Sequence, residues 1–132
     1  MKIYAIVLAV VIAAVVVGCG GGGGSETSPF AGQWQGSWVD AGNAQSGTVS
    51  LTIGTDGSMS GSIHNDTLSL DGTASGSISR SGQVAGAYAY PGQTYTTSGT
   101  LIVNGAGHLV GTLQIYDSGI LVGSADIDLT KT

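Results

Sequence analysis

The strongest constraint in this sequence is an alternation of apolar and polar residues with a period of two, which runs from Phe30 to the end of the chain. This period is typical of β-strands, whose successive side chains point to opposite faces, and no helical period occurs in this region. A glycine recurs on the apolar face of every alternating segment. These glycines are Gly36, Gly47, Gly61, Gly76, Gly86, Gly99, Gly111 and Gly123. Because glycine in a strand marks a bend or a close backbone approach, the repeat favours a strongly curved sheet.

Turn-forming pairs such as Asp56-Gly57, Pro91-Gly92 and Asn104-Gly105 divide this region into eight segments. We expect strands at residues 32–39, 46–54, 58–64, 67–79, 83–90, 94–103, 108–116 and 120–130. The segment 67–79 is the weakest, because Asp71-Gly72 is able to break it. Since the connections are short, neighbouring strands are expected to pair as antiparallel hairpins. The sequence therefore predicts an all-β fold, an eight-stranded antiparallel up-and-down barrel formed by residues 30–132.

The face opposite the glycines consists mainly of Ser, Thr, Gln and Asp, as in Thr48, Ser50 and Thr52. A barrel with its apolar face inside and this polar face in water fits the alternation. The alternative is a membrane-spanning barrel with its apolar face toward lipid, which needs aromatic girdles at both interfaces. Aromatic residues are sparse here, so we favour the first arrangement.

The beginning of the chain has a different pattern. Lys2 precedes 15 apolar residues, Ile3 to Val17. A membrane-spanning helix needs about 20, so the run fits the hydrophobic core of a signal peptide, which we place at residues 1–18. The run ends in Val16-Val17-Gly18-Cys19, which resembles the lipobox of bacterial lipoproteins. In that family a peptidase cuts before the cysteine and its thiol is acylated, with fatty acids such as palmitate. The resemblance implies lipidation at Cys19; the alternatives are an uncleaved anchor and a free thiol.

Residues 19–29 join the lipidated cysteine to the barrel. Five consecutive glycines follow Cys19, and a polar stretch continues to Pro29, which is the composition of a flexible tether. In enteric lipoproteins, which this segment resembles, an Asp after the cysteine favours the inner membrane, whereas here Gly20 occupies that position. We therefore expect a lipid-anchored protein of the cell envelope, in the outer membrane if the source has two membranes.

Charge and cysteine content exclude several classes of function. The chain has three Lys or Arg and eight Asp or Glu, which gives a net charge of −5. It therefore lacks the basic patch that nucleic acid requires. One cysteine cannot form an intramolecular disulfide or a multi-cysteine zinc site. We predict no cofactor and no metal. The expected partners are the membrane, through acyl chains on Cys19, and either a small apolar ligand or a protein.

The first barrel strand opens with Gly32-Gln33-Trp34-Gln35-Gly36-Ser37-Trp38. A Gly-x-Trp opening before eight up-and-down strands resembles the calycin group, which includes lipocalins, fatty-acid-binding proteins and avidins. Residues 49–61 are also similar to the start of avidin-type chains. The resemblance covers about residues 32–63 and implies the barrel fold. The tryptophans that surround biotin in avidins have no counterparts here, because no Trp follows Trp38. Small bacterial metalloprotease inhibitors open in a similar way.

Five aromatic residues are candidate ligand contacts. Trp34 and Trp38 share the inner face and either form an aromatic wall for a ligand or plug one end of the barrel, and we favour the plug. Tyr88, Tyr90 and Tyr95 flank the Pro91-Gly92 turn. They either form a rim that stacks on a ligand or a partner, or a cap of half-buried rings with hydroxyls in water.

The titratable residues do not indicate catalysis. His64 and His108 lie near turns that the spacing does not bring together, so we expect solvated side chains and no metal site. Asp126 and Asp128 share the outer face of the last strand, where carboxylates discourage edge pairing. No Ser–His–Asp grouping is apparent. We therefore expect a protein without enzymatic activity.

The predicted function is that of a non-catalytic envelope protein whose barrel binds a small apolar ligand or a partner macromolecule. The alternative is a filled, structural or protease-inhibitor-like barrel that acts through its loops. The two differ in whether the inner-face glycines leave a cavity or allow tight coiling, and eight-stranded barrels permit either outcome.

Overall fold

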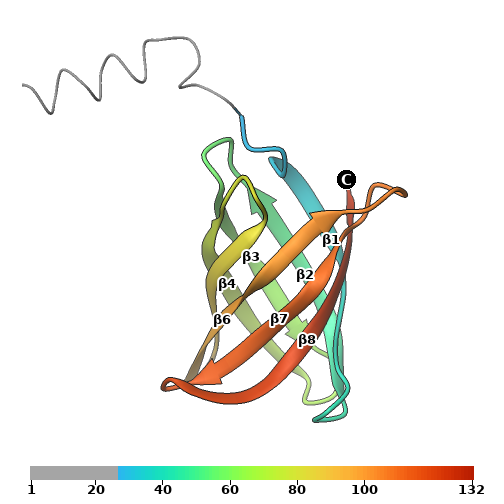
Figure 1. Ribbon diagram of the computed structural model, residues 1–132. Helices are drawn as coiled ribbons and strands as arrows, with labels where there is room; N and C mark the ends of the chain where they lie inside the picture. Colours follow the sequence, from blue (N-terminus) through green and yellow to red (C-terminus); the bar gives the residue numbers. More distant parts are fainter. Residues whose placement is uncertain (1–26) are drawn as a thin grey trace, which may run out of the picture.

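The structure is a computed structural model that describes residues 27–132. The predicted signal peptide, Cys19 and most of the predicted tether lie outside the described residues. The described part is a single closed β-barrel in which each strand pairs with its sequence neighbours and β1 pairs with β8 (Figure 1). No helix in residues 27–132 is long and apolar enough to cross a membrane.

The barrel has eight antiparallel strands in up-and-down order, which confirms the predicted fold class. The strands are β1 (Gly32–Asp40), β2 (Gln45–Ile53), β3 (Ser58–Asn65), β4 (Leu70–Ile78), β5 (Gln83–Tyr90), β6 (Gln93–Val103), β7 (Leu109–Asp117) and β8 (Ile120–Lys131). Most of these bounds lie within one residue of the predicted ranges. Closure removes free strand edges, so the backbone ladder runs continuously around the barrel.

The largest boundary difference concerns β4, which was predicted from residue 67 and begins at Leu70. Asn65 ends β3, and its side-chain oxygen accepts a hydrogen bond from the Leu68 backbone at 2.9 Å. Ser69 then takes a positive φ of 52°. An asparagine that bonds its own turn in this way competes with strand pairing, and it shortens the following strand. Asp71-Gly72 lies inside β4 and does not break it.

The apolar face points into the barrel, and the Ser and Thr face lies outside. Trp34, Trp38, Ile53, Leu109 and Leu129 are all at most 5% exposed. Outer residues such as Thr48 and Ser50 are exposed. The observed arrangement is therefore the first of the two predicted ones, with the apolar side chains inside and packed on one another.

Most of the inner-face glycines sit where neighbouring strands approach very closely. A Cβ atom on Gly36 would lie 2.1 Å from the Asp128 carbonyl oxygen, and one on Gly61 would lie 1.9 Å from the Ser50 carbonyl oxygen. Both distances are far below contact, so any side chain there would force the strands apart. The glycine repeat thus allows tight coiling, as the strongly tilted strands of Figure 1 show.

The first residues of β8 depart from the predicted face pattern. Its pairing with β7 shifts register, because Ile115 pairs with Gly123 whereas Tyr116 pairs with Leu121, which leaves Val122 unpaired as a bulge. Leu121, predicted on the inner face, is 57% exposed. One extra residue reverses the alternation beyond it, which explains the error. Val103, also predicted inside, is exposed at the end of β6.

Candidate functional site

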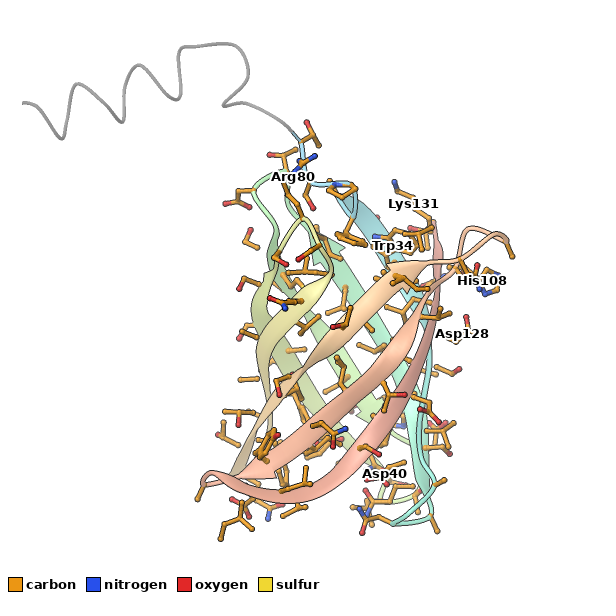
Figure 2. The ribbon with its side chains drawn as sticks, in the orientation of Figure 1. Trp34, Asp40, Arg80, His108, Asp128 and Lys131 are labelled. Atoms are coloured by element: carbon orange, nitrogen blue, oxygen red, sulfur yellow. The ribbon has the colours of Figure 1, made fainter. Side chains whose placement is uncertain are left out.

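The two ends of the barrel differ, and the end at which the chain enters is closed. Phe30 and Trp34 are buried there, and the Trp34 indole donates a hydrogen bond to the Phe30 carbonyl at 2.8 Å. The Lys131 ammonium lies 5.5 Å from the centre of the Trp34 ring. Arg80 donates to the Thr27 carbonyl at 2.8 Å on the same end (Figure 2). We call this the tether end, and Trp34 is its plug.

The opposite end is open, and we call it the distal mouth. It is a depression of about 220 Å³ between the turns that follow β1, β3, β5 and β7. Its lining residues are Trp38, Asp40, Asn43, Gln45, Leu68, Leu70, Tyr88, Tyr90, Gln93, Tyr95, Ile115, Asp117 and Val122. Asp40 marks this end in Figure 2, far from Trp34, Arg80 and Lys131. The mouth combines aromatic rings, carboxylates and amides in one concave surface.

Three tyrosines form one wall of the distal mouth. Tyr88 and Tyr95 are directly paired across β5 and β6, and their rings stack at 5.1 Å with 26° between the planes. Tyr90 meets the other two rings edge-on, with centroids 5.6 Å and 6.5 Å away. Such offset and edge contacts hold aromatic rings in place. The hairpin at Pro91-Gly92 therefore presents three rings in mutual contact as one aromatic surface.

Asp40 is a buried carboxylate in the same mouth, 5% exposed. The Asn43 backbone donates to one Asp40 oxygen at 3.1 Å, and the Asn43 amide donates to the other at 2.8 Å. A Cβ on Gly123 would lie 2.5 Å from the Asp40 carboxylate, so glycine at that position leaves the space that the carboxylate uses. Within residues 27–132, Asp40 forms no ion pair.

The tyrosine hydroxyls are affected by this environment. Burial raises the pKa of Tyr88 above its ordinary value, and the nearby Asp40 carboxylate adds to the rise. Burial also raises the pKa of Tyr90, against the effect of a hydrogen bond with the Asn65 side chain. Both hydroxyls are therefore neutral at physiological pH and able to donate or accept hydrogen bonds.

A second, smaller cavity lies inside the barrel. Its volume is about 90 Å³, and its lining is almost wholly apolar, with Leu51, Met59 and Leu113 among the lining residues. Trp38 and Tyr88 line both this cavity and the distal mouth, so the cavity lies directly behind the mouth. Pockets that enclose drug-sized ligands measure about 300–1,000 Å³, so the interior has room for only a small apolar group.

The remaining predicted candidates lie on the outer face. His64 hydrogen-bonds with Asp71 and lies 3.3 Å from Asp66, and His108 hydrogen-bonds with Asp128 at 2.7 Å. Asp126 accepts a bond from the Thr112 hydroxyl at 2.7 Å. All are substantially exposed. Asp66 lies in the turn after β3, and the other contacts join neighbouring strands or their ends on the outer surface.

The structure therefore brings together four of the five aromatic candidates. Trp38, Tyr88, Tyr90 and Tyr95 line the distal mouth, whereas Trp34 closes the other end. Sequence reasoning missed the polar residues of the mouth. Asp40 lies two residues after Trp38 on the same strand face, so the period of two was the signal that could have revealed it. Asn43 and Gln93 lie in or beside turns, where periodicity carries no information.

Comparison with known proteins returned no match from the protein-family models, the curated proteins or the solved structures. The closed barrel is in keeping with the calycin-like architecture that the opening motif implied.

Proposed function

We propose that this chain is a non-catalytic binding protein of the cell envelope, anchored by acyl chains on Cys19, which captures a ligand or a partner at its distal mouth. The observation that carries the proposal is the asymmetry of the barrel. Its tether end is closed by Phe30 and Trp34, whereas the opposite end is an aromatic and acidic depression. With the predicted anchor attached at the closed end, the mouth is free to face away from the membrane.

The volumes favour the mouth over the interior as the principal contact. The 90 Å³ cavity accommodates a small apolar group at most, and the 220 Å³ mouth opens to solvent above it. A ligand at the mouth would have its polar part among Asp40, Asn43 and Gln93, and a short apolar part directed toward Trp38. This combines the predicted apolar-ligand function with its loop-based alternative.

A protein partner is the second candidate, and it is supported by the exposed apolar residues around the mouth. Leu68, Ile120 and Leu121 are 51%, 68% and 57% exposed, and Val122 lies beside them. Exposed apolar residues that gather beside a concave site are typical of interaction surfaces. The binding proposal covers both kinds of occupant.

The test is native mass spectrometry of the full chain, purified from the membranes of its host. We expect a reproducible mass excess over the lipidated polypeptide that is lost on denaturation. The Tyr95→Ala variant should lose this excess, because it removes one ring of the stacked pair. The matched control Gln35→Ala, on the outer face, should keep it. If Tyr95→Ala retains the excess, or if the wild type carries no small molecule and no protein, the mouth is not the binding site.

Membrane anchoring has its own test. The lipobox interpretation predicts that cells fed labelled palmitate incorporate label into the wild-type chain, and that Cys19→Ser abolishes incorporation and releases the protein from the membrane fraction. Ser25→Ala, in the same tether, is the control and should behave as the wild type. Membrane retention of Cys19→Ser would favour an uncleaved anchor.

A further inference from the structure

The distal mouth contains an unusual pairing of groups, a buried carboxylate beside a cluster of aromatic rings. Asp40 is 5% exposed and lines the mouth together with Tyr88. Its hydrogen bonds come from Asn43, a neutral partner. A buried carboxylate that lacks a cationic partner keeps much of its desolvation cost, and a bound cation offsets that cost.

The described cations of the chain cannot fill this role. Arg80 and Lys131 lie at the tether end, at the far side of the barrel from Asp40 (Figure 2). Both histidines of the chain lie on the outer face and pair with other carboxylates. Asp117, at the end of β7, also lines the mouth and increases its negative character.

The aromatic rings supply the second half of a cation site. Tyr88 and Tyr95 stack on each other through one face of each ring. The opposite face of each ring is not covered by this stacking. Tyr95 is half-buried at the mouth, and Trp38 lies on its floor. The faces of such rings attract organic cations, most strongly where water is excluded, and quaternary ammonium groups are recognised by aromatic cages of this kind.

From these contacts we propose that the distal mouth binds a small molecule that carries an alkylammonium group, held between the Asp40 carboxylate and the rings of Trp38, Tyr88 and Tyr95. The proposal rests on the proposed function and names the class of ligand that it takes. The 220 Å³ of the mouth suits a compact cationic head group, and the apolar cavity behind Trp38 suits a few carbon atoms attached to it.

The test compares two probes that differ only in charge. Choline carries a trimethylammonium group, and its carbon isostere dimethylbutanol carries a neutral tert-butyl group of the same shape. Residues 27–132 contain the whole closed sheet and its core, so this part of the chain is used. Binding is followed by the indole N–H resonance of Trp38 at the mouth, with that of Trp34 at the plugged end as internal reference.

We expect choline to shift the Trp38 resonance and leave Trp34 unchanged, and to bind about tenfold or more tightly than dimethylbutanol. Asp40→Asn should weaken choline binding by about tenfold or more, without affecting the affinity for the neutral probe. Asp128→Asn, an exposed carboxylate at the other end, is the matched control and should bind choline as the wild type does. An unchanged Trp34 resonance shows that each variant is folded.

The outcomes separate this inference from the proposed function. If both probes shift Trp38 with equal affinity, the mouth binds ligands but charge plays no part, and the ammonium inference is wrong. If choline produces no shift, or if Asp40→Asn binds it as well as the wild type, the ammonium inference is also overturned. Native mass spectrometry of the full chain then still tests whether the mouth binds another ligand or a partner. The comparison of the two probes uses the wild type alone. It therefore tests the inference even if Asp40→Asn does not fold.

Discussion

Single glycines determine how closely the strands of this barrel approach one another. Gly36 faces the β8 backbone, where an added Cβ would lie 2.1 Å from the Asp128 carbonyl oxygen and 2.9 Å from the Leu129 Cα. Because these atoms belong to the backbone, they cannot move aside as a flexible side chain can. The strand pair that closes the barrel therefore depends on the absence of one methyl group.

We predict that Gly36→Ala lowers the free energy of unfolding by about 2 kcal/mol or more, since overpacking usually costs about 1–3 kcal/mol. In a domain of this size the melting temperature should fall by roughly 10 °C, measured by circular dichroism. Gly105→Ala is the control, since a Cβ there meets nothing within 4 Å, and its effect should stay within about 0.5 kcal/mol. Equal effects of the two substitutions would contradict the close-approach explanation.

Tyr88 gives a prediction about alkaline pH. Burial raises its pKa in the folded barrel above the ordinary 10.0. Above about pH 10 the unfolded chain loses this proton while the folded chain keeps it, so stability falls as pH rises. Urea unfolding of Tyr88→Phe should therefore depend less steeply on pH above about 10 than that of the wild type. Parallel curves for the two proteins would rule out this contribution.

Among the elements, β8 has two separate roles. Its second half, from Asp126 to Lys131, pairs with β1 and closes the barrel. Its first residues contain the bulge at Val122. The bulge moves Leu121 to the outside and places Val122 beside the distal mouth. The position of one unpaired residue thus decides which apolar side chains surround the candidate site.

Removal of residues 127–132 should abolish the cooperative thermal transition. The deletion takes away all but one of the β1–β8 residue pairs together with Leu129, which is 0% exposed. Burial of one leucine alone is worth about 2–5 kcal/mol, a large part of the 5–15 kcal/mol that stabilises an ordinary domain. Removal of Thr132 alone is the control and should leave the transition in place. A truncated chain that still melts cooperatively would show that closure is dispensable.

At the scale of the whole molecule, the barrel interior is nearly filled. The cavity of about 90 Å³ should admit xenon but exclude a long-chain fatty acid. We expect xenon under pressure to shift the methyl resonances of Leu51, Ile63 and Leu113, and palmitate to leave them unchanged. Ala125→Val, which places extra carbon atoms at the cavity wall, should reduce the xenon effect. A saturable palmitate shift at these methyl groups would instead indicate a carrier with an expandable interior.

The sequence alone determined the fold class, the strand count and the inner face of the sheet. A period of two and frequent turn pairs act over a few neighbouring residues, so they can be read without knowledge of the partner strands. For the same reason, the closeness of Tyr88 to Tyr95 could be predicted from the Pro91-Gly92 turn between them. The predicted start of β4 was wrong. The Asn65 side chain accepts a hydrogen bond from the turn backbone, and the periodicity of the sequence carries no sign of this bond.

Tertiary structure alone decided which end of the barrel is open. Trp34 and Trp38 have the same parity and the same residue type, yet one plugs the tether end under Phe30 and the other lies on the floor of the distal mouth. Asp40, Tyr95 and Asp117 meet there because β1, β6 and β7 all have an end at this mouth. Closure of the sheet brings together residues from distant parts of the chain, and the volume left between them depends on how tightly the whole sheet coils.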